Sequence, residues 1–448
     1  MVRTVVPSHL RRQHRRMMHK NTTTVRGFNK MNRYMNLWKK HKHRLKQMHE
    51  KEVSPHHSSS SETESESPSD SESESDREDE SDYKQGGYYR VRLNQIIHNR
   101  YRIVRKLGYG YFSTVWLVQS LHSHRLFAMK IQKSDSHFAK AAVEEHKFYQ
   151  HLQAPETKTT TTPLLSLSLV RPFVIRLEDF FALRVTRPVR AKHYCLVFES
   201  MWKDLYGLMK KRQFKSFPMT WIRTMSYQAL LGVYYLHREN IIHTDLKPEN
   251  FLVTPPGQTP FMLKVADLGN ACFVDKQYSD DIQTRQYRSP EVILGYPYST
   301  PVDIFSLGVM FMEFMVGDCI FNPSRCKQKN SAVIRNEKQL ALMISALQTP
   351  IPRFMIKQSK YGRHFFDPTC TLLRHARHVP EYSLKNIIEQ TYGQVDPQYL
   401  DLIQKMLCLN PHQRITAHQA LQHPFFESLH RDFQTQGNQV FRCPTEHQ

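Results

Sequence analysis

The chain has few cysteines, few glycines and no long apolar run. Its seven cysteines among 448 residues include no C-x-x-C pair, which favours neither a zinc site nor a disulfide framework and fits a reducing compartment. The longest apolar stretch, 304–316, is too short to span a membrane and contains Glu313. The first fifty residues lack the apolar core of a secretory signal. We therefore expect no membrane contact.

Charge divides the chain into an N-terminal region and a globular part. Residues 1–57 form a basic, histidine-rich arm, in which positions 1–52 could bind RNA or an import receptor, or act as a mitochondrial presequence. Residues 58–83 are mostly Ser, Asp and Glu, so they predict a disordered linker. Residues 84–448 hold 47 Lys and Arg against 28 Asp and Glu, a net charge of +19. The acidic linker could lie against this basic part and compete with a substrate.

The remaining pattern predicts two lobes. A lead-in segment at 84–100 precedes a small lobe at 101–198, and a mostly helical lobe follows at 202–426, with a tail at 427–448. The order of elements predicts an α+β fold. Residues 154–169 have the composition of an exposed insertion. Within the small lobe we expect one helix at 136–152 and strands at 101–107, 115–119, 126–131, 174–180 and 193–198.

A glycine-rich run at 107–115 lies between two of these strands. Small residues there let backbone N–H groups approach phosphates, although two glycines also suit a plain hairpin. Further on, Lys130 falls in the middle of an apolar strand, where its charge needs a partner unless it reaches the surface. Glu145, or alternatively Glu144, on the expected helix can supply that partner.

The segment 241–250, followed by Asp267-Leu268-Gly269, carries the most specific signal. Asp245 can orient a hydroxyl group and receive its proton, and Lys247 can offset charge on the phosphoryl group. Asn250 and Asp267 supply oxygen ligands suited to Mg²⁺. This spacing predicts a protein kinase that uses ATP and Mg²⁺ on Ser or Thr of a protein.

Other residues fit the same interpretation. Arg414 is expected to form a buried ion pair with Glu291, and Asp303 is expected to accept hydrogen bonds from the loop around His243. The connector after residue 198 is expected to bind adenine through its backbone. The predicted nucleotide site comprises Leu107, Gly108, Gly110, Val115, Ala128, Lys130, Glu145, Glu199 and Met201.

Three stretches carry a family resemblance: 86–88 with 100–117, 243–245, and 265–289. In these stretches the chain resembles the SR-protein kinases, which phosphorylate serines in Arg-Ser-rich splicing factors. The resemblance implies a bilobal eukaryotic protein kinase fold, Arg-Ser-rich protein substrates and a location in nucleus and cytoplasm. It also suggests a monomer. Thr244 stands where most kinases have Arg, so we expect activity without activating phosphorylation.

The chain also departs from that family. The spacer between the catalytic loop and Asp267 is short, and Pro290 is typical of CDC-like and dual-specificity kinases. Members of that family bind basic substrates in an acidic docking groove. By alignment this chain keeps Asp318 of that groove, but Lys338 and Ser345 stand where two further carboxylates are expected. Whether the chain phosphorylates long Arg-Ser tracts processively is therefore left open. The alternatives are a CDC-like or dual-specificity kinase with other nuclear substrates, and a catalytically silent scaffold.

Overall fold

A computed structural model describes residues 80–84, 86–155, 165–186, 190–255, 257–277, 279–323, 332–372, 383–394 and 396–441. The chain divides into two compact units, Met1–Lys84 and Gln85–Gln448. In the first unit the described element is η2 (Glu80–Tyr83). The basic arm at 1–57 and most of the acidic linker lie outside the described residues, as does most of the expected insertion at 154–169. No described helix is both long enough and apolar enough to cross a membrane.

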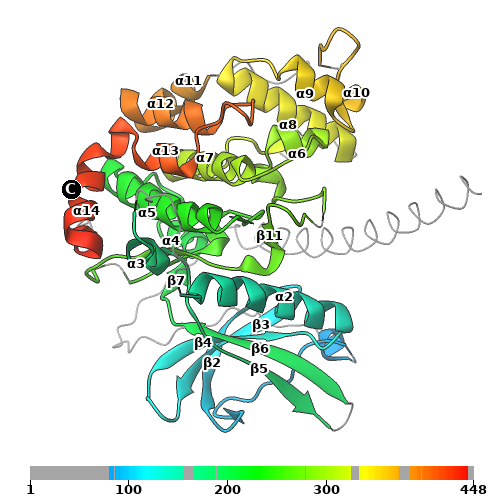
Figure 1. Cartoon of the computed structure of the whole chain (residues 1–448), viewed down its shortest axis with the longest axis vertical. Coiled ribbons are helices and arrows are strands. Elements are labelled where there is room, and N and C mark those ends of the chain that lie inside the picture. The colour runs from blue at the N-terminus through cyan, green and yellow to red at the C-terminus, as the bar shows by residue number, and fades with distance from the viewer. Residues whose placement is uncertain are drawn as a thin grey trace, which may run out of the picture. The chain divides into compact units, whose positions relative to one another are not determined.

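The second unit begins with an antiparallel sheet that forms the small lobe (Figure 1). Buried and exposed residues alternate along its strands, so one face packs on a core that includes Ile103, Val118 and Met129. In spatial order the strands are β1 (Ile96–Ile97), β2 (Tyr101–Tyr109), β3 (Ser113–Ser120), β4 (Leu126–Gln132), β6 (Ala191–Glu199) and β5 (Leu177–Val185).

The predicted strands of this lobe are confirmed, with one shift. The prediction of a strand at 174–180 placed its start too early, because 171–173 form the 3-10 helix η3 (Arg171–Phe173) and β5 begins at Leu177. Val174 instead makes an isolated bridge with Val265 of the larger lobe. The apolar residues before β5 therefore connect the lobes and do not extend the sheet.

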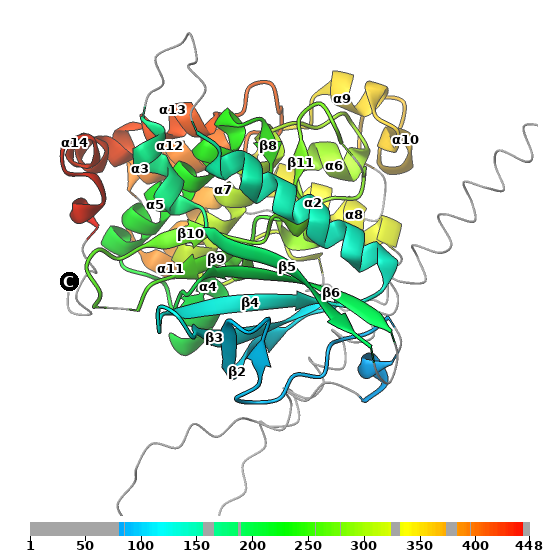
Figure 2. The same cartoon turned by 60° about the horizontal axis from the view of Figure 1, so that its bottom comes forward.

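The helix α2 (Ser136–Gln153) lies across the sheet beside β5 and β6, on the side of the larger lobe (Figure 2). Asp135 caps its N-terminus by accepting a hydrogen bond from the backbone N–H of His137 at 2.9 Å. Its buried face carries Glu145 among apolar residues such as Phe148 and Tyr149. The helix thus brings a carboxyl group under the sheet.

The larger lobe is built around α5 (Met219–Arg238) and α7 (Pro301–Val316), both almost entirely buried. Short strands beside α5 carry the loops of the candidate site: β7 (Lys203–Asp204), β9 (Phe251–Val253) and β10 (Leu263–Val265) form one sheet, and β8 (Ile241–Ile242) and β11 (Cys272–Phe273) form another. The other elements are α3 (Leu167–Val170), α4 (Leu205–Lys211), η4 (Pro248–Asn250), η5 (Leu268–Asn270), η6 (Arg285–Tyr287), α6 (Pro290–Leu294), α8 (Ala332–Leu347), α9 (Arg353–Gln358), α10 (Gly362–Phe365), α11 (Leu384–Tyr392), α12 (Pro397–Met406), α13 (Ala417–Leu421) and η9 (Pro424–Phe426).

The region that the sequence assigns to a C-terminal tail is folded as far as residue 441. It forms α14 (Glu427–Gln436) and η10 (Gly437–Val440), and α14 lies at one edge of the larger lobe (Figure 1). Phe433 and Phe441 are fully buried, and their rings pack against Phe173. This segment therefore belongs to the core of the larger lobe.

Candidate active site

Lys130 joins the two lobes through two carboxylates. Its ammonium lies 2.9 and 3.0 Å from the two Glu145 oxygens and 2.8 Å from Asp267 Oδ1. Glu145 is 1% exposed, whereas Glu144 faces solvent and pairs with Lys147. The choice that the sequence left open between the two glutamates is therefore decided in favour of Glu145.

Charge on this cluster is mutually stabilised. Burial acts against the positive charge of Lys130, but the Asp267 and Glu145 carboxylates raise the pKa of its ammonium above the ordinary value. The same ammonium lowers the pKa of Asp267 to about 2. Lys130 is consequently a cation and Asp267 an anion at neutral pH.

Asp267 occupies the turn between β10 and η5. Its backbone is left-handed, with a φ of 63°, which is uncommon for a residue other than glycine. Gly269 makes room for this turn, because a Cβ atom there would lie 3.2 Å from Asp267 Oδ1 and 3.5 Å from Glu145 Oε2. The Asp-Leu-Gly sequence therefore lets the carboxylate approach Lys130.

Asp245 and Lys247 form a second charged pair. Lys247 Nζ donates to Asp245 Oδ2 at 2.7 Å, and Asp245 raises the pKa of Lys247 although burial opposes the charge. Thr284 donates to Asp245 Oδ1 through its hydroxyl at 2.6 Å and its N–H at 3.1 Å. Lys247 also donates to the Thr284 hydroxyl at 3.1 Å. Sequence reasoning did not single out Thr284, although it lies in the stretch 265–289 that carried the family resemblance.

Asn250 has the orientation that a magnesium ligand needs. Its Nδ2 donates to the backbone oxygen of Asp245 at 2.7 Å, which leaves the side-chain oxygen available for a cation. Its backbone oxygen accepts from the N–H of Ala266, the residue before Asp267. Among the described residues no group of three His, Cys, Asp or Glu could hold a metal. Mg²⁺ needs only one or two protein oxygens when phosphates supply others, so these residues fit it.

Asp303 of α7 holds the backbone of the catalytic loop, 243–250, as the sequence predicts. It accepts from the N–H groups of His243 at 2.8 Å and Thr244 at 3.0 Å. Thr244 has a φ of 67°, so its left-handed backbone is held by this buried carboxylate. His243 Nε2 lies 3.0 Å from the oxygen of Ala266, which ties the loop to the strand before Asp267.

Four of the predicted nucleotide-site residues lie on one face of the sheet. Gly108, Val115 and Lys130 pair across β2, β3 and β4, and Ala128 lies two residues before Lys130 on the same face. Gly110 is in the hairpin at the end of β2. Leu107 precedes Gly108 in β2 and is 37% exposed.

The connector between the lobes begins at the end of β6. The Glu199 carboxylate accepts from Lys264 at 2.7 and 2.8 Å and from the N–H of Arg176 at 2.9 Å. Met201 packs against the core of the larger lobe. The side chain of Glu199 thus fixes the connector, which leaves its backbone as the part that could contact a nucleotide.

The end of the activation segment, 267–291, is fixed by a buried ion pair. Arg414 donates to both oxygens of Glu291, at 2.6 and 2.9 Å, and neither side chain is exposed. The predicted pair is therefore confirmed. A buried bidentate pair of this kind fixes the position of a segment by its geometry.

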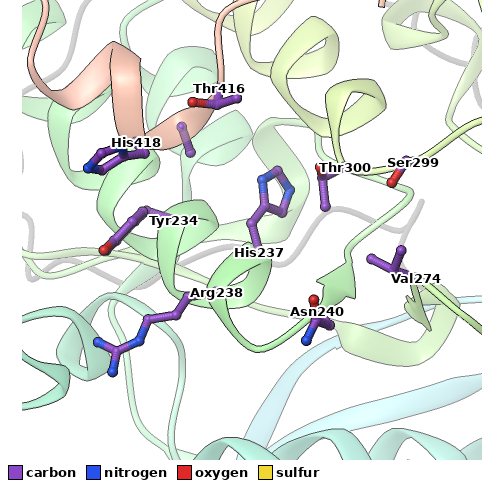
Figure 3. A pocket seen from close by; sticks show the side chains of 10 residues that line it. Tyr234, His237, Arg238, Asn240, Val274, Ser299, Thr300, Thr416 and His418 are labelled. Atoms are coloured by element: carbon purple, nitrogen blue, oxygen red, sulfur yellow. The ribbon is translucent and has the colours of Figure 1, made fainter. Parts of the chain in front are cut away.

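A separate cavity of about 400 Å³ lies behind the catalytic loop and contains none of the predicted site residues. Figure 3 shows His237 in its wall between Tyr234 and Thr300. His237 Nε2 lies 2.9 Å from the Asp303 carboxylate. The cavity therefore lies beside Asp303, which holds the catalytic loop, and is not lined by the predicted nucleotide-site residues.

Similarity to known proteins identifies the class to which the molecule belongs. Residues 101–426 match the protein kinase domain family, which defines the molecule as a protein kinase. The serine/threonine-protein kinase SRPK of Physarum polycephalum is 32% identical over 78% of this chain and 91% of that protein. Protein kinase dsk1 of Schizosaccharomyces pombe is 26% identical over 75% of this chain and 82% of that protein. Dual specificity protein kinase CLK1 of Homo sapiens is 28% identical over 77% and 69%.

The chain belongs to the SR-protein kinase family, and it is a serine/threonine protein kinase. Its two lobes are those of the bilobal kinase fold, as the sequence predicts.

Proposed function

We propose that this kinase transfers the γ-phosphoryl group of ATP to serine in Arg-Ser-rich proteins, with Asp245 as the base. The observation that carries the proposal is the closeness of two charged clusters, Lys130 with Glu145 and Asp267, and Asp245 with Lys247. Lys247 is near enough to Asp267 to help lower the pKa of that carboxyl group. When bound, Mg-ATP supplies the phosphoryl group and the metal charge that neutralises it.

The protein residues have distinct tasks in this proposal. Lys130 holds the α- and β-phosphates, while Asn250 and Asp267 offer oxygens to the metal. Asp245 accepts the proton of the substrate hydroxyl and orients its oxygen toward the phosphorus. Lys247, protonated beside Asp245, offsets negative charge on the transferring group. Thr284 holds the Asp245 carboxylate in position through two hydrogen bonds.

A group of carboxylates supports basic substrates. Glu313 is buried, and its burial together with the nearby Glu249 and Asp318 carboxylates raises its pKa to about 7. The Tyr287 hydroxyl of the activation segment donates to Glu313 at 2.6 Å. Glu249 and Asp318 are exposed, so the negative potential of these two carboxylates would attract arginine side chains of a peptide.

We further propose that activity does not require phosphorylation of the activation segment. The Gln283 N–H donates to the oxygen of Thr244 at 2.9 Å, and its amide oxygen accepts from the Ser289 N–H and hydroxyl. Its amide nitrogen donates to Ser306 Oγ at 2.8 Å. A neutral glutamine thus makes the connections for which other kinases recruit a phosphate.

The test is incubation of phosphatase-treated enzyme with labelled ATP, Mg²⁺ and either an Arg-Ser repeat peptide or a Ser-Pro peptide. We expect label on the Arg-Ser peptide, and Asp245→Ala should lower kcat by roughly 10²–10⁴-fold because the base is lost. Asp245→Asn, which keeps the shape of the side chain, is the matched control for folding and should be equally impaired. Full activity in either variant would refute the role of Asp245, and no turnover before phosphorylation would refute the constitutive active state.

A second candidate is a dual-specificity kinase of other nuclear proteins. Pro290 and the similarity to dual specificity protein kinase CLK1 favour it. Preferential labelling of the Ser-Pro peptide, or label on tyrosine, would support this candidate.

The remaining proposals are a monomer that is found in both nucleus and cytoplasm, and contact of residues 1–52 with RNA or an import receptor. Comparison of RNA binding by the full chain and by a chain that starts at residue 85 tests the RNA contact.

A further inference from the structure

The glycine-rich loop is held by residues that precede the matched kinase domain. The Tyr88 hydroxyl donates to the backbone oxygen of Gly110 at 2.6 Å, and Tyr88 is only 6% exposed. The Gly110 oxygen also accepts from the N–H of Ser113, which closes the hairpin at the tip of the loop. A side chain from outside residues 101–426 therefore fixes the conformation of the loop that lies above the predicted phosphate site.

Residues 86–88, which we call the strap, are anchored at the start of α2. The N–H groups of Ser134 and Asp135 donate to the oxygens of Gly87 and Gly86 at 3.1 and 3.0 Å. Gly86 has a φ of 84°, which an L-residue rarely adopts. Because Asp135 is also the N-cap of α2, the strap and the helix that carries Glu145 are held together.

Lys133 completes the connection between strap, loop and helix. Its ammonium lies 4.1 Å from the centre of the Tyr88 ring and 5.2 Å from that of Tyr111. Its backbone N–H donates to the oxygen of Phe112 at 2.9 Å. Phe138 of α2 contacts Tyr111 and Phe112 edge to face, with ring centres 5.8 and 5.7 Å away. The loop tip is thus enclosed between the strap and the helix.

We propose that Tyr88 is a positioning residue for the triphosphate: it preorganises the glycine-rich loop so that the loop binds the phosphates of ATP without first becoming ordered. The inference rests on the proposed binding of ATP in this cleft. A loop without the Tyr88 hydrogen bond would sample more conformations, and nucleotide binding would have to order it. The loss of affinity should be limited to ligands that carry phosphates, because Tyr88 holds the loop tip, whereas adenine is expected to bind the connector at 199–201.

The experiment is calorimetric titration of the full chain, with Mg²⁺, using the ATP analogue adenylyl-imidodiphosphate and, separately, adenosine. Tyr88→Phe removes one hydroxyl and keeps the ring over Lys133, so we expect about fivefold weaker binding of the analogue, which is typical of one lost hydrogen bond. Adenosine binding should stay unchanged. Tyr88→Ala also loses the ring and should weaken the analogue by roughly tenfold or more.

Tyr89→Phe is the matched control. Its hydroxyl accepts from Gln95 Nε2 at 2.7 Å in the same lead-in segment but does not contact the loop tip. This variant should bind both ligands as the wild type does. If Tyr88→Phe binds the analogue as tightly as wild type, or weakens analogue and adenosine equally, the inference is wrong. If wild type itself does not bind the analogue, the proposed nucleotide site is wrong, and the inference about Tyr88, which rests on that site, is wrong as well.

Discussion

At the scale of single residues, Glu313 shows how the surroundings of a carboxyl group set its charge. It lies in the apolar helix α7, where burial raises its pKa to about 7, and Tyr287 donates a hydrogen bond to it. The folded chain therefore binds a proton at this site between about pH 4.5 and 7, where the unfolded chain has released it. Stability from this group is present at acid pH and is lost as pH rises through 7.

Glu313→Gln should remove this pH dependence. The amide mimics the protonated acid, so thermal unfolding of the variant and of wild type should be similar near pH 4, below the pKa of the carboxyl group in both the folded and the unfolded chain. At pH 8 the variant should be more stable, by up to about 3 kcal/mol, because wild type must keep a buried carboxylate there. Melting temperatures at the two pH values measure the difference. An equal effect of the substitution at both pH values would show that Glu313 does not titrate in this range.

Sequence reasoning could name those candidate site residues that local spacing connects. The positions of Asp245, Asn250 and Asp267 could be assigned because the motif fixes them relative to one another along the chain. Glu313, by contrast, was noticed only as a charge that interrupts an apolar run. Its raised pKa depends on burial and on Glu249 and Asp318, which only the fold brings together around it.

At the scale of elements, the activation segment depends on one glutamine that bridges three parts of the larger lobe. Gln283 connects the catalytic loop, the residue before α6, and α7 at Val302 and Ser306. The sequence predicted constitutive activity from Thr244 alone, because the partners of Gln283 are distant in sequence. The contacts that we propose in place of a phosphate could be identified only in the folded chain.

Gln283→Ala should therefore impair both stability and turnover. The variant leaves the buried N–H and hydroxyl of Ser289 without the oxygen to which both donate, which should cost about 3 kcal/mol. Because the segment also positions Thr284 beside Asp245, kcat should fall by at least about tenfold. Gln286→Ala, three residues along the same segment and outside this bridge, is the control. Unchanged kcat in Gln283→Ala would mean that the segment keeps its conformation by other contacts.

At the scale of the whole molecule, the folded unit extends beyond the matched kinase domain at both ends. The strap precedes residue 101, and α14 with η10 follows residue 426. The sequence could not assign the C-terminal segment to the core, because its two buried aromatic residues pack on partners such as Phe173, which lie far earlier in the chain. The helix α14 has only two apolar residues at helical spacing, Leu429 and Phe433, which is too weak a pattern to indicate such packing.

Phe441 is the residue through which this C-terminal extension can be tested. Its backbone oxygen accepts from the N–H of Phe261 at 2.7 Å, and its ring is fully buried. Phe441→Ala should destabilise the chain by about 3–5 kcal/mol, a lowering of the melting temperature by roughly 10 °C. Gln434→Ala on the exposed side of α14 should leave it unchanged, and so should a chain that ends at residue 441. If a chain that ends at residue 426 has the same melting temperature as wild type, the extension is dispensable and the larger lobe is complete without it.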